Sequence, residues 1–455
     1  MPKFFVTTPI YYINDKPHIG HAYPTIAADI LARYHRQQND TVLFSAGIDE
    51  NSQKTVEAAE KAKQEVQAYT DTMAETWQRT WDTSGISYDT FIRTTSPQHK
   101  QAVYAFMKKV QDAGDFYEGE YEGLYCIGCE EFKRETELVD GKCPLHDRVP
   151  EKRKEKNYFF KLSRYQDALL KHIEANPDFI LPEGRRNEIL SFIKGGLNDF
   201  SVSRQHGKWG IDWPNDPTQK VYVWFDALIN YLTVTGYPDA ASSKWWPAEL
   251  QIVGKDIIKF HCVYWPAMLM SAGLPLPQHI FAHGFFTIDG KKMSKSLGNS
   301  IDPVQLAGQY GIDALRFYLF REIPFGGDGE FSRQRFHEVY ETQLANDLGN
   351  AVQRVSSMVT RYMGGTLGEL PKAAHDVGLY HEAMQQFRLD KAIDELWIHV
   401  KGVNQYIEDE KPWKLAKEDK EQLVSVLQQA TADLLHIAGL LLPFIPATAQ
   451  RIAQT

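Results

Sequence analysis

Two kinds of hydrophobic pattern alternate over the first eighty or so residues of the chain. Mainly apolar runs predict buried strands at Phe4–Ile10 and Thr41–Ala46. Between them, helical spacing of apolar residues predicts a helix at about Pro24–Gln38. A later helix is predicted by five apolar side chains about one turn apart: Val66, Tyr69, Met73, Trp77 and Trp81. The order strand, helix, strand, helix is typical of a parallel, doubly wound α/β sheet.

The pattern changes after about Gly114. From there to about Pro214 the chain is rich in Tyr, Gly, Cys and charged residues, which predicts an insertion with its own small fold. Short apolar runs resume near Val221, at Leu250–Val253 and at His279–Ala282. From about residue 330 the apolar spacing is helical to the end, so we expect an all-α C-terminal part.

Composition excludes some classes of protein. The 455 residues are 43% hydrophobic and 24% charged, as in ordinary globular proteins, and they suggest about three domains. No run of eighteen apolar residues occurs and the N-terminus has no signal-peptide layout, so no membrane span or export is expected. The net charge of -9 argues mildly against a nucleic-acid partner, although local patches decide that question.

Three of the four cysteines fall in one metal-ligand pattern. Cys126-x-x-Cys129 is followed by Cys143-x-x-His146, which offers three thiolates and one imidazole. Four such ligands suit a tetrahedral, structural Zn²⁺ and leave no open position for catalysis. Metal-binding cysteines also favour a reducing cytoplasm over an oxidising compartment. Cys262 stands apart and is expected to be a buried free thiol.

Two short motifs indicate phosphate chemistry. His18-Ile19-Gly20-His21 lies between a predicted strand and a predicted helix, where a helix N-terminus favours anions and glycine allows close approach. Lys292-Met293-Ser294-Lys295-Ser296 is bracketed by Gly290 and Gly298, and it offers lysine charges and serine hydroxyls to a polyphosphate. HxGH alone is a weak signal, and a lysine run is usually a solvated loop. Together, near strand ends of a doubly wound sheet, they predict a nucleotide site.

The two motifs resemble the HIGH and KMSKS signatures of class I aminoacyl-tRNA synthetases. The resemblance implies that an amino acid is activated with ATP, as an adenylate plus pyrophosphate, and is then transferred to tRNA. It assigns His18, His21, Lys292 and Lys295 to catalysis by stabilising the phosphates, with Gly20, Ser294 and Ser296 also at the ATP. Mg²⁺ is expected with the ATP, because such chemistry depends on positioning and charge stabilisation.

Further segments are similar to the methionyl-tRNA synthetase family over nearly the whole chain. They are Pro9–Asn14, Val223–Tyr231 and Gly254–His261, with Asp49 between the first two. The resemblance implies a methionine pocket formed by Ile10, Tyr12, Asp49, Trp224, Ala227, Leu228, Tyr231, Ile257 and His261. Asp49 would receive the substrate ammonium group. Gly254 and Asp256 would hold the ribose, and His283 would lie near the adenine.

The C-terminal part resembles the anticodon-binding bundle of the same family. By that likeness Asn350 and Arg354, four residues apart on one helix face, and Pro412 and Trp413 would contact the anticodon of tRNA(Met), including the initiator. Without the resemblance, a solvated helix face and a packed tryptophan would explain these residues. One departure is visible: many relatives carry His-Gly after Asp49-Glu50, whereas this chain has Asn51-Ser52. The absence of a further C-terminal domain favours a monomer.

The expected fold is thus a doubly wound, Rossmann-type parallel sheet with an inserted zinc-knuckle domain and an all-α anticodon-binding bundle. Five ranges are predicted: 1–115 and 216–285 for the halves of the catalytic domain, 116–215 for the insertion, 286–330 for the KMSKS loop and stem-contact region, and 331–455 for the bundle. Two alternatives stay open. One is a tRNA-independent nucleotidyltransferase of the HxGH type, and the other is a non-catalytic tRNA-binding paralogue.

Overall fold

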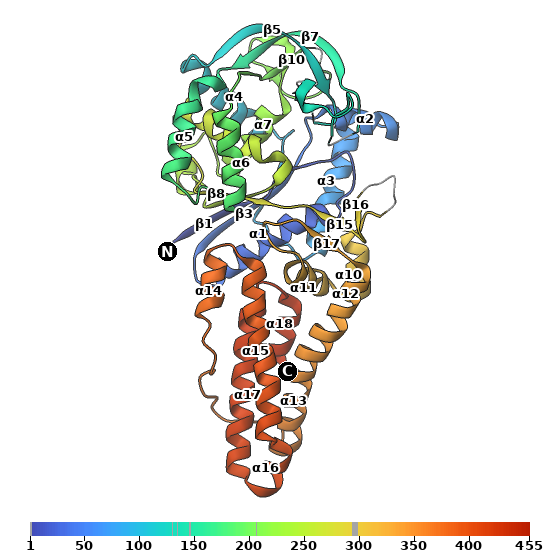
Figure 1. Ribbon diagram of the computed structural model, residues 1–455, viewed down its shortest axis with the longest axis vertical. Coiled ribbons are helices and arrows are strands. Elements are labelled where there is room, and N and C mark those ends of the chain that lie inside the picture. Colours follow the sequence, from blue (N-terminus) through green and yellow to red (C-terminus); the bar gives the residue numbers. More distant parts are fainter. Residues whose placement is uncertain (1, 130, 134, 145–146, 206, 294–298) are drawn as a thin grey trace. The chain divides into compact units, whose positions relative to one another are not determined.

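A parallel sheet forms the core of the computed structural model, which describes residues 2–129, 131–133, 135–144, 147–205, 207–293 and 299–455 (Figure 1). Its strands follow the order β2-β3-β1-β13-β14-β8, with β4 paired to the other side of β3. Their bounds are β1 Lys3–Thr7, β2 Tyr11–Tyr12, β3 Thr41–Asp49, β4 Thr90–Arg93, β8 Ile180–Leu181, β13 Leu250–Gly254 and β14 His279–His283. Every pairing is parallel, which confirms the predicted doubly wound sheet.

The central strands are apolar because both faces of the sheet are covered. Phe5, Val6, Phe44 and Ile252 have no exposed surface. Parallel strands buried on two sides are expected to be continuous apolar runs. The predicted helix of Val66–Trp81 is α3, Val66–Thr83, and Trp77 and Trp81 are fully buried in it. α2 (Gln53–Ala62) and α4 (Pro97–Asp112) are the neighbouring helices in the sequence.

The structure corrects two details of the predicted elements. β3 extends three residues further than predicted and ends on Asp49. The apolar run near Val221 belongs to β12 (Asp216–Val221) of a small antiparallel sheet with β10 (Ser203–Gln205) and β11 (Asp212–Trp213). A single apolar run does not reveal which sheet it joins, because parallel and antiparallel strands are formed by the same types of apolar residue.

The insertion contains an antiparallel sheet in the order β6-β5-β7-β9. Its strands are β5 Phe116–Cys126, β6 Glu131–Lys133, β7 Glu151–Phe160 and β9 Phe200–Ser201. Between β7 and β9 the chain forms α5 (Gln166–Ala175) and α6 (Glu183–Lys194) and returns to the main sheet through β8. The range 116–215 therefore includes an edge strand of the catalytic sheet.

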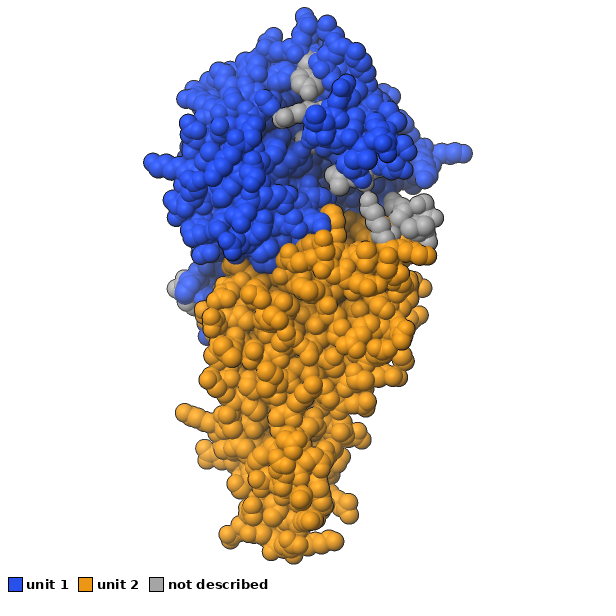
Figure 2. All heavy atoms as spheres, in the orientation of Figure 1, with its two compact units in different colours: residues 1–17, 39–283 blue, residues 18–38, 284–455 orange. Residues whose placement is uncertain are grey.

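The chain divides into two compact units, residues 1–17 with 39–283 and residues 18–38 with 284–455 (Figure 2). The second unit holds α1 (Ile19–Gln37), a small sheet and the C-terminal helices. The small sheet is β16-β15-β17, and the helices that follow it are α10 to α18, with a π-helical segment at Tyr340–Gly349. Their bounds are β15 Phe286–Ile288, β16 Lys291–Lys292, β17 Gly329–Phe331, α10 Pro303–Tyr310, α11 Ile312–Glu322, α12 Arg333–Val339, α13 Asn350–Met363, α14 Gly378–Gln385, α15 Leu389–Glu410, α16 Pro412–Glu418, α17 Lys420–Leu441 and α18 Pro446–Gln454. The predicted helical C-terminal part is confirmed, with α13, α15 and α17 packed side by side (Figure 1).

α17 is, among the described helices, the one long and apolar enough to cross a membrane by length and composition. Its apolar residues lie three or four positions apart, and Leu427, Ala430, Ile437 and Leu441 are fully buried. Packing against α13 and α15 explains that apolar surface as the core of a helical bundle.

A buried ion pair fastens α1 within the second unit. Arg316 of α11 lies 2.7 Å from Asp29 of α1, and neither side chain is exposed. The same guanidinium donates to the carbonyl oxygens of Pro443 (2.8 Å) and Phe444 (2.7 Å), between α17 and α18. Arg33 also pairs with Asp29, at 2.7 Å. Buried charges are stable only when paired and hydrogen-bonded in this way.

Candidate active site and metal centre

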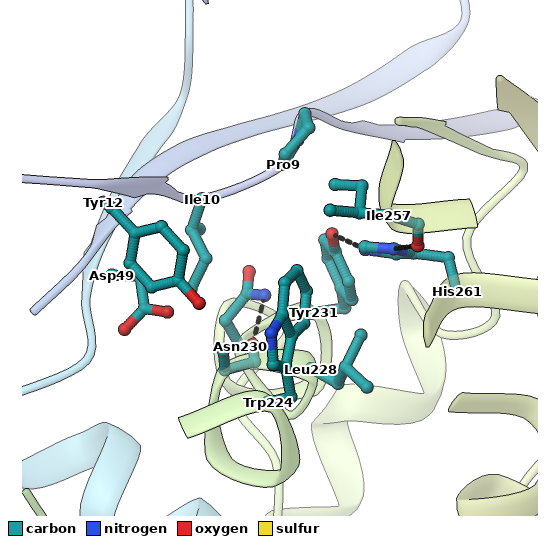
Figure 3. Close-up of a pocket in the computed structure, with 11 residues that line it drawn as sticks. Pro9, Ile10, Tyr12, Asp49, Trp224, Leu228, Asn230, Tyr231, Ile257 and His261 are labelled. Carbon is teal, nitrogen blue, oxygen red and sulfur yellow. Dashed lines mark hydrogen bonds between the residues drawn. The ribbon is translucent and has the colours of Figure 1, made fainter. Parts of the chain in front are cut away.

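Nine residues predicted for methionine line one pocket of the first unit (Figure 3). They are Ile10, Tyr12, Asp49, Trp224, Ala227, Leu228, Tyr231, Ile257 and His261. Pro9 and Asn230 complete the lining, and both lie beside predicted residues in the matched segments. The cavity measures only about 20 Å³, close to the room that one water needs, so the side chains themselves nearly fill it.

The strand ends bring these residues together. The chain leaves β1 at Thr7, and β2 then aligns Tyr12 with Asp49 at the end of β3. α7 (Val223–Leu228) supplies Trp224, Ala227 and Leu228, and the π-helical turn Phe260–Tyr264 supplies His261. Ligands of doubly wound folds bind at the carboxyl ends of the strands, which is where the pocket lies.

Aromatic packing defines the wall of the pocket. The Trp224 ring stacks on Phe260 with centroids 4.0 Å apart and an interplanar angle of 2°. Tyr12 and His261 each meet Trp224 edge-on, with centroids at 6.3 Å. Phe260 is a residue that the sequence pattern did not single out, although it precedes His261. A thioether is suited to such a wall, because sulfur–aromatic contacts are favourable.

Burial holds His261 in its neutral form, and two hydrogen bonds inside the pocket fix which ring nitrogen carries the proton. Nδ1 of His261 lies 3.1 Å from the carbonyl oxygen of Ile257, so this nitrogen carries the proton and donates. Nε2 therefore accepts from the Tyr231 hydroxyl at 2.8 Å. Burial lowers the pKa of His261 to about 4, and burial also raises the pKa of Tyr231. The pair thus presents a neutral, polar edge to a bound side chain.

We expect His261 to make the protein less stable in mild acid. Its folded pKa of about 4 lies below the ordinary value of 6.5, so the unfolded chain binds a proton that the folded chain excludes. The contribution of neutral His261 to the free energy of unfolding is complete above pH 6.5. It is lost as the pH falls from 6.5 to 4, by up to about 1.4 kcal/mol per pH unit. Urea unfolding between pH 7.5 and 4.5 measures it, and the slope should be shallower in His261→Phe. Equal slopes for the two proteins would contradict this assignment.

The loop after Asp49 explains the two residues that depart from the family pattern. Asn51 donates its backbone N–H to Oδ1 of Asp49 at 3.2 Å. Its side-chain amide donates to the carbonyl oxygen of Thr94 and to Oδ2 of Asp226, both at 3.2 Å. Ser52 caps α2 by accepting from the N–H of Thr55 at 3.1 Å. Both side chains are therefore structural partners within the first unit.

The residues predicted for the nucleoside gather at the ends of β13 and β14. Gly254 ends β13 and His283 ends β14, and the two are register partners. A Cβ at Gly254 would lie 2.5 Å from Oδ1 of Asp256 and 3.7 Å from Nε2 of His283. A larger residue at this position would therefore push the Asp256 carboxylate aside, whereas glycine leaves the backbone open to close approach.

The HIGH-like motif forms the first turn of α1, which corrects the predicted start of that helix at Pro24. His18 is the N-cap residue: its Nδ1 accepts from the N–H of Gly20 at 3.1 Å. In return Nδ1 of His21 accepts from the N–H of His18 at 3.2 Å, and the rings stack with centroids 3.7 Å apart. In the neutral rings the proton then sits on Nε2 of both histidines. Pro24 therefore lies inside the helix, beyond its first turn.

The start of the KMSKS-like segment lies against this turn within the second unit. A Cβ on Gly20 would lie 3.0 Å from Cε of Met293 and 3.0 Å from Cε1 of His18, so a larger residue would push them aside. The backbone of Lys292 pairs with Thr287 in β15. Ser294, Lys295 and Ser296 lie outside the described residues.

Three of the four predicted metal ligands form a compact cluster in the insertion. The Sγ atoms of Cys126, Cys129 and Cys143 lie within 4.8 Å of one another, with Cys129 and Cys143 at 3.5 Å. That spacing is far too long for a disulfide, and tetrahedral Zn–S bonds place sulfurs about 3.8 Å apart. Cys126 and Cys143 are buried, and His146 lies outside the described residues. The donor set and its spacing fit Zn²⁺. Cys262 is also buried, and it lies in the π-helical turn of the pocket.

Arg354 and Trp413 lie together on the surface of the helical bundle. The Arg354 guanidinium is 5.8 Å from the centroid of the Trp413 ring, which is 37% exposed. Arg354 also pairs with Glu408 of α15 at 2.7 Å, a partner that the sequence pattern did not reveal. Asn350 begins α13 one turn before Arg354 and is exposed, whereas Pro412 is buried at the start of α16. An exposed ring beside a cation is the arrangement on which unstacked bases bind.

The parallel sheet, the HxGH turn at the start of a helix and Met293 beside that turn, at the start of a KMSKS-like sequence, together define a class I aminoacyl-tRNA synthetase. The family model "tRNA synthetases class I (M)" matches residues 4–148 and 133–356, and that of the anticodon binding domain of methionyl tRNA ligase matches residues 369–455. The chain belongs to the methionyl-tRNA synthetase family, and its activity is that of a methionine–tRNA ligase.

Individual relatives agree over the length of the chain. The methionine–tRNA ligase of Thermotoga maritima is 44% identical over 99% of this chain and 74% of its own, and that of Thermosynechococcus vestitus is 44% identical over 99% and 89%. The solved structure of Mycobacterium tuberculosis methionyl-tRNA synthetase in complex with methionyl-adenylate has a TM-score of 0.95 and 40% identity. It covers 99% of this chain and 93% of that chain. Family membership removes the alternative of a tRNA-independent nucleotidyltransferase.

Proposed function

We propose that the pocket of Figure 3 selects methionine and presents its carboxylate to ATP. Asp49 accepts hydrogen bonds from the substrate ammonium group, and the aromatic wall of Trp224 and Tyr12 holds the thioether. The observation that supports this most is the convergence of nine predicted residues on one pocket. Since the cavity is nearly filled, side chains of the wall must shift as methionine enters.

In the activation step a carboxylate oxygen of methionine attacks the α-phosphorus of ATP. The bond from that phosphorus to the oxygen bridging the β-phosphate breaks, so methionyl-adenylate forms and pyrophosphate leaves. His18 and His21 donate from Nε2 to the phosphates, and Lys292 and Lys295 neutralise the leaving charge, aided by Ser294, Ser296 and the open backbone at Gly20. Mg²⁺ arrives with ATP and supplies further neutralisation when bound. A ribose hydroxyl at the tRNA end then attacks the methionyl carbonyl and releases AMP.

The nucleoside half of ATP is proposed to rest on the ends of β13 and β14. The backbone at Gly254 and the carboxylate of Asp256 hold the ribose hydroxyls, and His283 lies at the adenine. Ile257, between Asp256 and His261, then separates the nucleoside from the methionine side chain, because it lines the pocket.

The cysteine cluster is proposed to hold one structural Zn²⁺ through Cys126, Cys129, Cys143 and His146. A closed set of four protein ligands stabilises the fold of a small insertion such as this knuckle. Purified protein should contain about one zinc per chain by elemental analysis. Cys143→Ser should lower that content well below one, whereas Cys262→Ser should retain it. Equal zinc in the two variants would contradict the site.

The helical domain is proposed to bind the anticodon of tRNA(Met), including the initiator, through Asn350, Arg354, Pro412 and Trp413. We expect Trp413→Ala to raise the KM for tRNA roughly 10- to 100-fold, because one stacked base is worth about 1–3 kcal/mol. ATP–pyrophosphate exchange should stay unchanged, since it needs no tRNA. Leu435→Ala removes an equally exposed apolar side chain from the same domain and serves as the control. Equal changes of the KM for tRNA in the two variants would contradict the proposed role of Trp413.

ATP–pyrophosphate exchange with each standard amino acid in turn tests the proposed pocket. Exchange that depends on methionine alone would support the assignment. Exchange driven by another amino acid would overturn the roles of Trp224, Tyr231 and His261. Absence of exchange from folded, zinc-containing protein would favour the non-catalytic paralogue.

A further inference from the structure

Asn51 lies behind the pocket and does not line it, yet it contacts two of the segments that form it. Its side chain is buried, with 7% of its surface exposed. It follows the end of β3 by two residues, and Asp226 lies 175 positions further along, on α7. On either side of Asp226, Trp224 and Ala227 line the pocket.

The hydrogen bonds of Asn51 run in different directions. The backbone N–H donates to Oδ1 of Asp49, which fixes the rotation of that carboxylate. The side-chain amide uses one donor on the carbonyl oxygen of Thr94 and the other on Oδ2 of Asp226. One residue therefore joins β3, the segment after β4, and α7.

The neighbours of Asn51 are held by other groups, so its amide is the part directed at α7. Glu50 has no exposed surface, pairs with Arg93 at 2.7 Å and accepts from the N–H of Thr95 at 3.2 Å. The indole N–H of Trp209 donates to the carbonyl oxygen of Glu50 at 2.9 Å. Ser52 is committed to capping α2. Loss of the Asn51 amide would therefore leave this segment in place but separate it from α7.

We propose that Asn51 is a positioning residue for amino-acid binding: it sets the Asp49 carboxylate and the Trp224-bearing helix at one fixed spacing. The Asp49 carboxylate binds the ammonium group of the substrate, and the helix with Trp224 contacts the side chain of the substrate. Because one residue holds both protein groups, a change at Asn51 should weaken both contacts together. This inference rests on the proposed role of Asp49 in binding the ammonium group.

Steady-state exchange kinetics with Asn51→Ala test the proposal. The KM for methionine should rise roughly tenfold or more, as expected for a buried hydrogen bond to a charged group, while the KM for ATP changes less than twofold. Ser52→Ala is the matched control: it alters the next residue of the same segment, weakens a helix cap, and should leave the KM for methionine unchanged. A rise confined to Asn51→Ala supports the proposal. Equal rises of the KM for methionine in Asn51→Ala and Ser52→Ala would overturn it. So would equal rises of the KM for methionine and the KM for ATP in Asn51→Ala.

A double-mutant cycle shows whether the bond to Asp226 carries the effect. Asp226→Ala should raise the KM for methionine by some factor in the unmodified protein. In the Asn51→Ala background the same substitution should raise it by a factor at least three times smaller. Additive effects would overturn the link to α7. If Asn51→Ala does not fold, Asn51→Leu keeps the size and shape of the side chain, loses both donors without adding a charge, and should show the same rise in the KM for methionine.

Asp49→Asn separates this inference from the proposed function. An unchanged KM for methionine in Asp49→Asn would contradict the proposed contact between Asp49 and the ammonium group. A raised KM for methionine in Asp49→Asn, together with a normal one in Asn51→Ala, would contradict only the role of Asn51.

Discussion

Alanine in place of His18 will slow methionine-dependent ATP–pyrophosphate exchange by roughly 100- to 1,000-fold, with the KM for methionine little changed. Removing one preorganised donor to developing charge has an effect of this size in enzymes. The proton of His18 is held on Nε2 because Nδ1 accepts from the N–H of Gly20, so the ring is set to donate before ATP arrives. Initial rates of ATP–pyrophosphate exchange at a series of methionine concentrations measure both the loss of rate and the KM.

His18 also caps α1, so the alanine variant changes two properties at once. Loss of an N-cap costs about 0.5–2 kcal/mol of helix stability. His18→Asn separates the effects, since asparagine is a favoured cap and lacks the Nε2 donor. We expect this variant to melt near the temperature of the unmodified protein and to remain slow. Exchange restored to near-normal rates by asparagine would assign His18 to capping alone.

Leucine in place of Arg316 will destabilise the second unit by about 3 kcal/mol or more. The substitution removes a buried partner from Asp29 and leaves the carbonyl oxygens of Pro443 and Phe444 without their donor. Breaking a buried pair typically costs about 3–5 kcal/mol, because a charge is left behind in the core. Amide hydrogen exchange of α1 and α18, together with the urea midpoint, measures the loss.

Arg333→Leu provides the comparison for that variant. Arg333 pairs with Asp289 at 2.8 Å in the same unit, but both side chains are about half exposed. An exposed pair contributes roughly 0–1 kcal/mol, so this variant should unfold close to the unmodified protein. If Arg316→Leu and Arg333→Leu lowered the free energy of unfolding by similar amounts, the buried pair with Asp29 would contribute no more stability than an exposed pair.

The sequence alone was sufficient for features that are contiguous or periodic. The parallel sheet followed from apolar runs and α3 from the regular spacing of its apolar and aromatic residues. The pocket residues followed only from the resemblance of three short segments and Asp49 to a known family. The cysteine cluster followed from ligand spacing, because a CxxC turn can bring two sulfurs to one point. Such signals lie within a few residues of each other and need no knowledge of the tertiary fold.

Features that depend on distant partners could not be predicted in this way. The helix start at His18 was missed because proline usually marks the first turn, and the reciprocal histidine caps were not anticipated. Val221 was assigned to the main sheet because its apolar run does not reveal the antiparallel partner Ser203. The bonds from Asn51 to Asp226 and from Arg354 to Glu408 join residues far apart in the chain, and no local pattern encodes them.

The fastening of α1 to α11 has a consequence for synthesis of the chain. Asp29 leaves the ribosome 287 residues before Arg316, the difference between their positions. At about 5–20 residues per second, α1 is complete roughly 15–60 s before its buried partner exists. During that interval Tyr23 of α1, which is fully buried in the folded chain, lacks the rings of Phe286, Phe320 and Phe325 that surround it in the second unit. The nascent protein therefore carries this side of α1 without its native partners until Phe325 has been translated, and in that interval it is open to binding by a ribosome-associated chaperone.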